Sequence, residues 1–516
     1  MKHLFSLIAS FGSKAFSKSL DKIERVGNAL PHPATLFAML ALAVALLSAI
    51  CAWGSVSAVH PVSKATIESR NLLNLDGLRW IYTNVLKNFL DFPPLGYVLV
   101  VMIGIGVAEG SGLFTLMIRA LVLTAPQKWI TGAVVLAGVI SHLASEGGYV
   151  ILIPLGAAIF HALGRHPMAG LAAAFCGVSG GFGSNLLITS VDTMLCGMTE
   201  TAARMILPGM TITPAVNFYF LFVSAILVVV VGTWVTEKIV IPRLGAYQGT
   251  AERLPVEKLS AIEKKGLLGA SIALLIAFAL LAFSIIPENG ILRNPQTKSA
   301  LHSPFFDGII VGILLIFFVP GIVYGIIVKS IKSDKDVVTH ITNSMKGIAG
   351  YIVLVFFASQ FVAFFNYSKL GIILAIKGAA FLQSIQLTGI PLVISFVLLS
   401  AFINLFMGSA SAKWAIMAPV FVPMFMLIDP AYHPALTQAA FRIGDSITNV
   451  ITPMMSYFAL IVAFSQRYDE KYGIGTIIST MIPYTIFLGI FWTLLLIIWV
   501  QTGYPLGPDA PIFLTK

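Results

Sequence analysis

Charged side chains are rare in this sequence. Two groups of residues in the otherwise apolar chain combine charged side chains with polar or aromatic ones that could share a site. The first group contains Glu146 and Asp192, with Asn185 between them. The second group comprises Asn404, Ser409, Ser411, Lys413, Trp414, Arg442, Asp445 and Asn449, followed by Pro453. Because a charge within the hydrocarbon of a membrane is costly, such residues are expected to line a functional site.

These side chains together could hold an organic anion and a cation in one cavity. Arg442 can bind a carboxylate through two parallel hydrogen bonds, and Trp414 offers an aromatic face for stacking. A sodium ion would take oxygens from Asn404 and Asp445, from hydroxyl groups and from freed backbone carbonyls. A proton would need only a buried carboxylate, so H⁺ and Na⁺ stay open as alternative coupling ions.

The composition places these residues in a membrane protein. Of the 516 residues, 58% are hydrophobic and 10% are charged, against about 25% charged in soluble domains. The mean hydropathy of +0.92 leaves too little polar sequence to coat a soluble surface. Soluble enzymes and nucleic-acid-binding modules are therefore excluded, and the net charge of +10 is expected to flank membrane spans. We expect no enzymatic activity, no enzymatic cofactor and no nucleic-acid partner.

Long apolar runs predict an all-helical polytopic fold. A helix needs about 20 apolar residues to cross the hydrocarbon core. On this criterion, single spans are predicted near residues 34 to 53, 94 to 118, 216 to 236, 267 to 286, 305 to 328, 348 to 366 and 476 to 500. Two longer runs, 167 to 205 and 434 to 463, are interrupted by polar residues and proline, and each predicts one broken span. The total is about nine transmembrane helices.

Two further segments, 129 to 163 and 391 to 429, each contain two short apolar arms around a tip of small residues. Each arm is short for a full crossing, so both segments predict re-entrant hairpins. Cytoplasmic loops of membrane proteins carry an excess of Lys and Arg. When the N-terminus is placed inside, Lys and Arg of this sequence collect in the loops that fall on the cytoplasmic side, which supports that orientation. The basic N-terminal segment is expected to lie on that cytoplasmic surface.

An internal repeat relates the two hairpins and the two broken helices. The tip, the following proline and the His-Pro pair of the first half recur in the same order in the second, at an offset of 265 between Gly148 and Lys413. The predicted topology gives the two halves opposite orientations, and inverted repeats with helices broken at the midplane are typical of secondary transporters. The expected organisation is an N-terminal segment (1–33), a first span with an interfacial segment (34–93), a first repeat (94–240), linking spans (241–347), a second repeat (348–502) and a tail (503–516).

Each candidate also has a structural interpretation. Arg442 and Asp445, three residues apart on a helix, could form only an ion pair within the scaffold. Asn185 and Asn449 could satisfy backbone groups at helix ends, and Trp414 could be ordinary packing.

Other functions are possible alternatives. The segment Gly177-Val178-Ser179-Gly180-Gly181 matches the G-x-S-x-G pattern of serine hydrolases, although no strand-turn-helix context surrounds it. A channel would differ from a transporter in being unable to accumulate substrate against its gradient. A transporter of another organic anion, such as a dicarboxylate, is the third alternative.

Several motifs resemble those of the AbgT family of p-aminobenzoyl-glutamate transporters. They are Ser145-Glu146-Gly147-Gly148-Tyr149, Gly183-Ser184-Asn185-Leu186, Ser190-Val191-Asp192, Gly408-Ser409-Ala410-Ser411-Ala412-Lys413-Trp414 and Phe441-Arg442-Ile443-Gly444-Asp445-Ser446. The similarity extends from Asn28 to Pro508, almost the whole chain.

The resemblance implies a bowl-shaped homodimer in the bacterial inner membrane, with nine spans and two hairpins per subunit. It implies ion-coupled transport of p-aminobenzoyl-glutamate, with export of p-aminobenzoate-like sulfonamides by some members. The family's transport residues correspond to Asp192, Ser411, Trp414, Arg442, Asp445 and Pro453, and its sodium site to Asn404 and Asp445. Lys413 departs from the family's uncharged residue, which leaves the substrate open.

Overall fold

The computed structural model describes residues 31, 33–59, 65–144, 148–249, 251, 259–298, 303–455 and 457–514. Glu146 and most of the predicted N-terminal segment lie outside these residues. The described chain is almost entirely helical, and its only sheet there pairs two short antiparallel strands, β1 (Ser57–Val59) and β2 (Thr66–Glu68). The predicted all-helical membrane fold is confirmed.

Eight helical runs in the described chain are long and apolar enough to cross a membrane, or up to ten if each sharply bent helix pair counts as one span. They are α3 (Pro33–Trp53), α4 with α5 (Leu75–Gly110), α11 to α12 (Phe218–Leu244), α13 (Ala261–Ile285), α15 (Ile309–Val328), α17 (Ala349–Tyr367), α20 (Ala410–Leu427) and α23 (Ile474–Thr502). Six of the seven predicted single spans coincide with one of these runs. The interfacial segment expected after the first span contains α4 (Leu75–Leu90), which continues into α5 (Pro93–Gly110).

The predicted span 94 to 118 is wrong at its C-terminal end. Helix α5 stops at Gly110, and Gly112 adopts a left-handed backbone with φ of +90°. Such a conformation ends a helix, and the apolar residues that follow form a separate helix, α6 (Leu113–Thr124). Its 12 residues span about 18 Å, too short to cross the membrane. Between Thr124 and Gln127 the chain turns by 115°, and η1 (Gln127–Trp129) then leads into the first hairpin.

The second half of the chain also contains a short apolar helix followed by a sharp turn. Helix α18 (Leu370–Ser384), which was not among the predicted elements, turns by 119° into α19 (Gly389–Asn404). Each half therefore runs from a span through a short apolar helix into a hairpin, and then into a broken helix and a final span. The order of elements repeats as the sequence predicted.

The hairpin arms and broken helices have these bounds. The first hairpin consists of α7 (Ile130–Ile140), η2 (Ser141–Ala144), the π-helix η3 (Gly148–Leu152) and α8 (Ile153–Ala162), and the second of α19 and α20. The prediction that each arm is too short for a full crossing is wrong for α20, whose 18 residues are long and apolar enough. The first broken helix consists of α9 (Pro167–Phe175), the π-helix η4 (Cys176–Gly180) and α10 (Ser190–Ala203), and the second of α21 (Pro434–Asn449) and α22 (Phe458–Gln466). The π-helix η5 (Thr236–Val240) and α12 (Ile241–Leu244) extend α11 (Phe218–Val235).

Both broken helices begin in the same way, which supports their relation by an internal repeat. His166 precedes α9, and its Nδ1 accepts a hydrogen bond from the backbone N–H of Met168 at 3.2 Å. His433 precedes α21, and its Nδ1 accepts one from Ala435 at 3.2 Å. In each case proline follows the histidine at the first helical position, where its missing N–H costs nothing.

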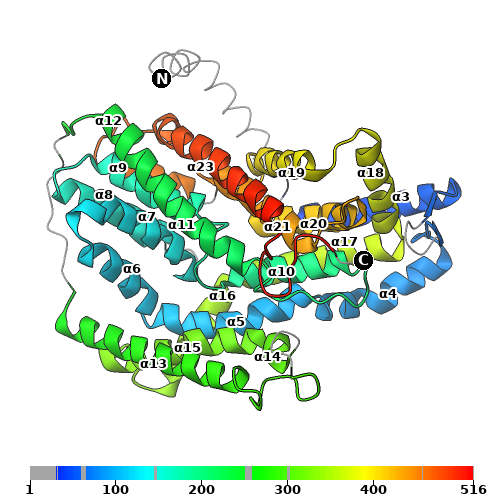
Figure 1. The fold of residues 1–516 in the computed structure, drawn as a ribbon, viewed down its shortest axis with the longest axis horizontal. Helices are drawn as coiled ribbons and strands as arrows, with labels where there is room; N and C mark the ends of the chain where they lie inside the picture. Colours follow the sequence, from blue (N-terminus) through cyan, green and yellow to red (C-terminus); the bar gives the residue numbers. More distant parts are fainter. Residues whose placement is uncertain are drawn as a thin grey trace.

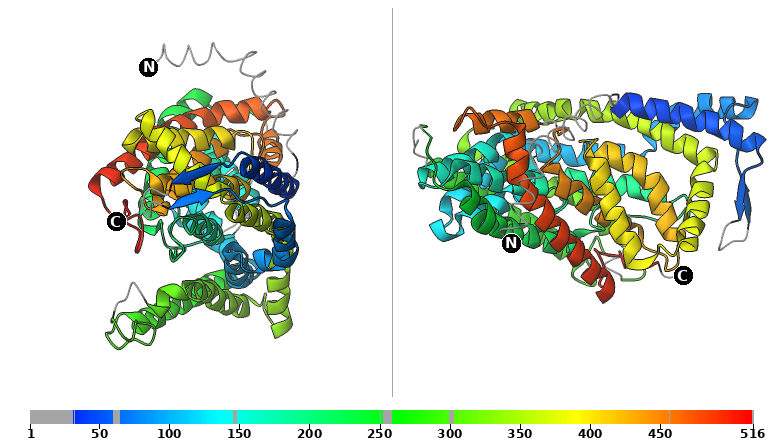
Figure 2. Two further views of the ribbon diagram at one scale, coloured as in Figure 1. Left: turned by 90° about the vertical axis from the view of Figure 1, so that its right-hand side faces the viewer. Right: turned by 90° about the horizontal axis from the view of Figure 1, so that it is seen from above.

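Helices α10 and α21 of the two broken helices lie near the middle of the molecule (Figure 1), and α9 and α21 are buried at every residue. Helix α10 packs against α5, α20 and α21, and α21 also packs against α19 and α23. Helices α13, α14 (Pro304–Asp307) and α15 extend away from this core (Figure 2, left). They are joined to it through α5, which α15 and α16 (Asp334–Gly347) contact. In the most apolar 18-residue stretch of α13, only 11% of the residues are buried, as expected for a helix that faces lipid.

Candidate functional site

Helix α21 carries several polar side chains and is completely enclosed. All 16 of its residues are buried. Gln438, Arg442, Asp445 and Asn449 follow one another at spacings of four, three and four residues, which places them on one face. Because buried polar groups must find partners inside the protein, this face has to meet polar groups from other elements.

Arg442 meets Asp192, a residue of the opposite repeat. The guanidinium Nη1 donates to Asp192 Oδ1 at 2.5 Å, and both side chains are 3% exposed. Asp192 lies in the first turn of α10, directly after the break in the first broken helix. The predicted convergence of the two broken helices is therefore present in the structure.

The break in the first repeat is held by hydrogen bonds within the repeat and by one to α21. Asp192 accepts from Asn185 Nδ2 at 2.9 Å and from the backbone and hydroxyl of Thr189 at 2.7 and 2.8 Å. The backbone N–H of Gly183 donates to Ser446 Oγ at 2.7 Å. A Cβ on Gly183 would lie 2.5 Å from that Oγ, so only glycine allows this approach. The predicted role of Asn185 at the break thus has a structural component, since it orients Asp192.

Several buried polar atoms around the ion pair have no hydrogen-bond partner among the described residues. They include Nε and Nη2 of Arg442, Oδ1 of Asn185 and Nε2 of His142. The ring of His142 lies edge-on to Phe182 in the break, with 5.4 Å between centroids. A guanidinium with two unused donors can bind a carboxylate, because the fork geometry matches two carboxylate oxygens.

The predicted sodium ligands Asn404 and Asp445 also lie together, but the ammonium of Lys413 lies between them. Lys413 Nζ contacts Asp445 Oδ1 and Asn404 Oδ1, and its side chain is fully buried. Asn449 Nδ2 donates to Asp445 Oδ2 at 3.3 Å. Within the described chain no cluster of three or more His, Cys, Asp and Glu side chains could hold a metal ion. In this arrangement the predicted ligands do not fit sodium, because they already bind a cation.

The remaining predicted site residues lie on the second hairpin and the second break. The Oγ of Ser411 is 3.1 Å from the Oγ of Ser409, which begins α20. Pro453 lies in the break after α21 and is partly exposed. Trp414 is fully buried, and its ring packs on Phe441 with 4.6 Å between centroids.

A hydrogen-bonded chain beside this site escaped the sequence analysis. Gln438 Nε2 donates to Thr199 Oγ1 at 2.8 Å, and Asn217 Nδ2 donates to Gln438 Oε1 at 2.5 Å. Trp414 Nε1 donates to the same Thr199 hydroxyl at 2.9 Å. Gln438 could have been found from its position one turn before Arg442, whereas no pattern predicts Thr199 or Asn217.

The serine hydrolase alternative lacks structural support. Ser179 lies in the π-helix η4 rather than at a turn between a strand and a helix. Its hydroxyl accepts a hydrogen bond from Tyr149 OH at 3.4 Å and donates one to Met455 Sδ at 3.2 Å, and a thioether is not a base that could activate a serine. Ser179 is therefore a packing residue of the broken helix.

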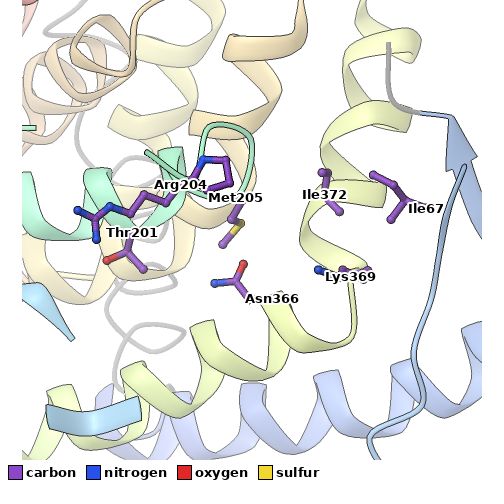
Figure 3. A pocket seen from close by; sticks show the side chains of 8 residues that line it. Ile67, Thr201, Arg204, Met205, Asn366, Lys369 and Ile372 are labelled. Atoms are coloured by element: carbon purple, nitrogen blue, oxygen red, sulfur yellow. The ribbon is translucent and has the colours of Figure 1, made fainter. Parts of the chain in front are cut away.

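A cavity of about 310 Å³ lies away from these ion pairs (Figure 3). It is lined by Thr201 and Arg204 at the end of α10, by Lys369 before α18, and by residues of β2 and α17. Asp192 and Thr201 are nine residues apart on α10, so about 14 Å of helix separates the cavity from the ion pair. Arg204 is paired with Glu200 at 2.5 Å.

Comparison with known proteins identifies the family. The model of the "AbgT putative transporter family" matches residues 18–514. The p-aminobenzoyl-glutamate transport protein of Escherichia coli (strain K12) is 39% identical over 486 residues, which cover 94% of this chain and 95% of that protein. The chain belongs to the AbgT family.

Two solved structures of AbgT-family transporters share this fold. The Neisseria gonorrhoeae MtrF structure has a TM-score of 0.90 and 46% identity, and covers 95% of this chain and 100% of its own. The Alcanivorax borkumensis YdaH structure has a TM-score of 0.88 and 43% identity, with coverages of 93% and 100%. This AbgT chain is therefore a multi-pass membrane transporter, in agreement with the sequence-based interpretation.

Proposed function

We propose that this AbgT chain is an ion-coupled secondary transporter of p-aminobenzoyl-glutamate and related aromatic amides in the bacterial inner membrane. The observation that carries the proposal is the buried guanidinium of Arg442 at the meeting point of two broken helices, where two of its donors have no partner among the described residues. The Escherichia coli relative that is 39% identical to this chain is named as a p-aminobenzoyl-glutamate transport protein.

The glutamate part of this substrate suits Arg442. A carboxylate can accept hydrogen bonds from Nε and Nη2 while Nη1 stays on Asp192. Because Asp192 is fixed by Asn185 and Thr189, the guanidinium is oriented before the substrate arrives. Movement of one repeat against the other would open this site to each side of the membrane in turn.

Export of an antimetabolite such as a sulfonamide is the second candidate. The MtrF structure, at 46% identity, is described as illuminating a class of antimetabolite efflux pumps. An anionic sulfonamide would also accept hydrogen bonds from Arg442. A simple dicarboxylate is the remaining alternative, and it would use Arg442 without needing an aromatic contact.

Transport by reconstituted protein tests these assignments. Proteoliposomes would be given labelled p-aminobenzoyl-glutamate, a sulfonamide or succinate, with pH and sodium gradients imposed separately. Accumulation of p-aminobenzoyl-glutamate above the external concentration is the expected result, and it would also exclude a channel. Accumulation of succinate alone would refute the proposed substrate class.

The homodimer and the cytoplasmic N-terminus complete the proposal. Exposed apolar side chains run along α13, among them Leu268, Leu275 and Phe283. Such a surface suits lipid or a second copy of the chain. Mass measurement of the protein in detergent would test the dimer.

A further inference from the structure

We propose that the ammonium of Lys413 is a built-in cation that takes the place of sodium at Asn404 and Asp445. The site formed by Asn404 and Asp445 then binds no sodium unless the ammonium of Lys413 is removed. The inference rests on the proposed function only in treating this cluster as part of an ion-coupled transporter.

The position of Lys413 is the first observation. It lies in the first turn of α20, directly after the tip of the second hairpin. Its side chain is fully buried and its Nζ contacts Asp445 Oδ1 and Asn404 Oδ1. A buried ammonium needs such oxygens, because it carries three N–H donors and no acceptor. The contacts are those that a compact metal cation would make with the same two side chains.

The orientation of Asn404 is the second observation. Its Nδ2 directs its two hydrogens at three acceptors, the backbone oxygen of Asp445 at 2.6 Å, Thr448 Oγ1 at 2.9 Å and Asn449 Oδ1 at 2.9 Å. These bonds fix the amide so that Oδ1 faces Lys413. The oxygens that sodium would require are therefore already directed at the ammonium. A second cation in the same cage would meet the ammonium at contact distance, where like charges repel strongly.

The internal repeat provides the third observation. At the offset of 265, the counterpart of Lys413 in the first repeat is Gly148, which has no side chain. A Cβ at Gly148 would lie 2.1 Å from Ser141 Oγ, so no lysine fits there. The tethered cation thus belongs to one repeat only. It neutralises Asp445, while Arg442 neutralises Asp192, and neither carboxylate of the site needs a metal ion for charge balance.

Thermal unfolding of the full-length protein in detergent, without any substrate, tests the proposal. Tm would be measured in NaCl and in choline chloride at equal ionic strength for the wild type, Lys413→Gln and Lys413→Arg. The wild type and Lys413→Arg, which keeps a tethered charge, should show no sodium-specific shift. Lys413→Gln leaves Asp445 without its cation, so sodium should raise its Tm saturably by about 2 °C or more. Adding Asp445→Asn to Lys413→Gln should abolish the shift.

Two outcomes would overturn the proposal. One is a saturable, sodium-specific rise in the Tm of the wild type, and the other is a folded Lys413→Gln protein that does not respond to sodium. If Lys413→Gln does not fold, binding of radioactive ²²Na⁺ to the wild type decides, because saturable binding would contradict the proposal and its absence would support it. These measurements use no substrate, so an error in the proposed substrate leaves them unaffected.

Discussion

Arg442→Lys is the most informative change at the site, because it keeps the buried positive charge and removes the fork of donors. Arg442→Ala would instead leave Asp192 buried without its partner, at a cost of about 3–5 kcal/mol in stability. A lysine can still pair with Asp192. It cannot offer the two additional donors, Nε and Nη2, that have no partner in the described chain.

The expected loss follows from those two donors. A hydrogen bond to a charged group contributes about 1.5–3 kcal/mol, so two of them contribute about 3–6 kcal/mol to binding of a carboxylate. Since about 1.4 kcal/mol changes an equilibrium constant tenfold, KM for p-aminobenzoyl-glutamate should rise at least about 100-fold. The assay is initial uptake by proteoliposomes, with Tm measured in parallel to show that the variant is folded.

Arg204→Lys is the matched control. Arg204 is also paired with a carboxylate, that of Glu200, but its side chain is 43% exposed and lies at the far end of α10. Because Arg204 lies outside the proposed site and lysine keeps its charge, KM should stay within about twofold of the wild-type value. An Arg442→Lys protein that transports with unchanged KM would refute the assignment of a substrate carboxylate to Arg442.

Three further changes test other parts of the structure. Asp445→Asn leaves the ammonium of Lys413 without a carboxylate and should lower stability by about 3–5 kcal/mol; an unchanged Tm would contradict the pairing. Ser179→Ala should keep wild-type transport within about twofold, because Ser179 only packs, and a loss of all activity would revive the hydrolase alternative. Burial lowers the pKa of His433 to about 4, so its neutral cap on Ala435 stabilises the fold above about pH 6.5, and this stability is lost as the pH falls toward 4. Between pH 7.5 and 5 the wild type should therefore lose roughly 2 kcal/mol of stability that His433→Asn, which keeps a capping group but does not titrate, retains. An equal fall in Tm of the wild type and the variant over this pH range would count against this role of His433.

The sequence predicted the spans because each is a long apolar run, and it predicted the pairing of the two halves because tip, proline and His-Pro recur in order. The membrane makes both signals strong, since unpaired backbone cannot face lipid. Short apolar helices carry no such signal. Helices α6 and α18, with 12 and 15 residues, were absorbed into a span or missed, and their sharp turns depend on local backbone such as that at Gly112.

The site was predictable as a set of residues but not as a set of pairs. Asp192 and Arg442 stood out because charges inside apolar runs are rare, and the structure brings them into contact. The direction of a long side chain is not encoded in spacing, so the sequence left the role of Lys413 open. Its contact with both predicted sodium ligands depends on how the hairpin tip packs on α21.

An experimental structure of the protein with bound p-aminobenzoyl-glutamate would test the central claim most directly. We expect ligand density between α10 and α21, with a carboxylate within hydrogen-bond distance of Arg442 Nε and Nη2 while Asp192 keeps its contact with Nη1. Density confined to the 310 Å³ cavity beside Arg204 and Lys369, with the guanidinium of Arg442 still unliganded, would contradict the account.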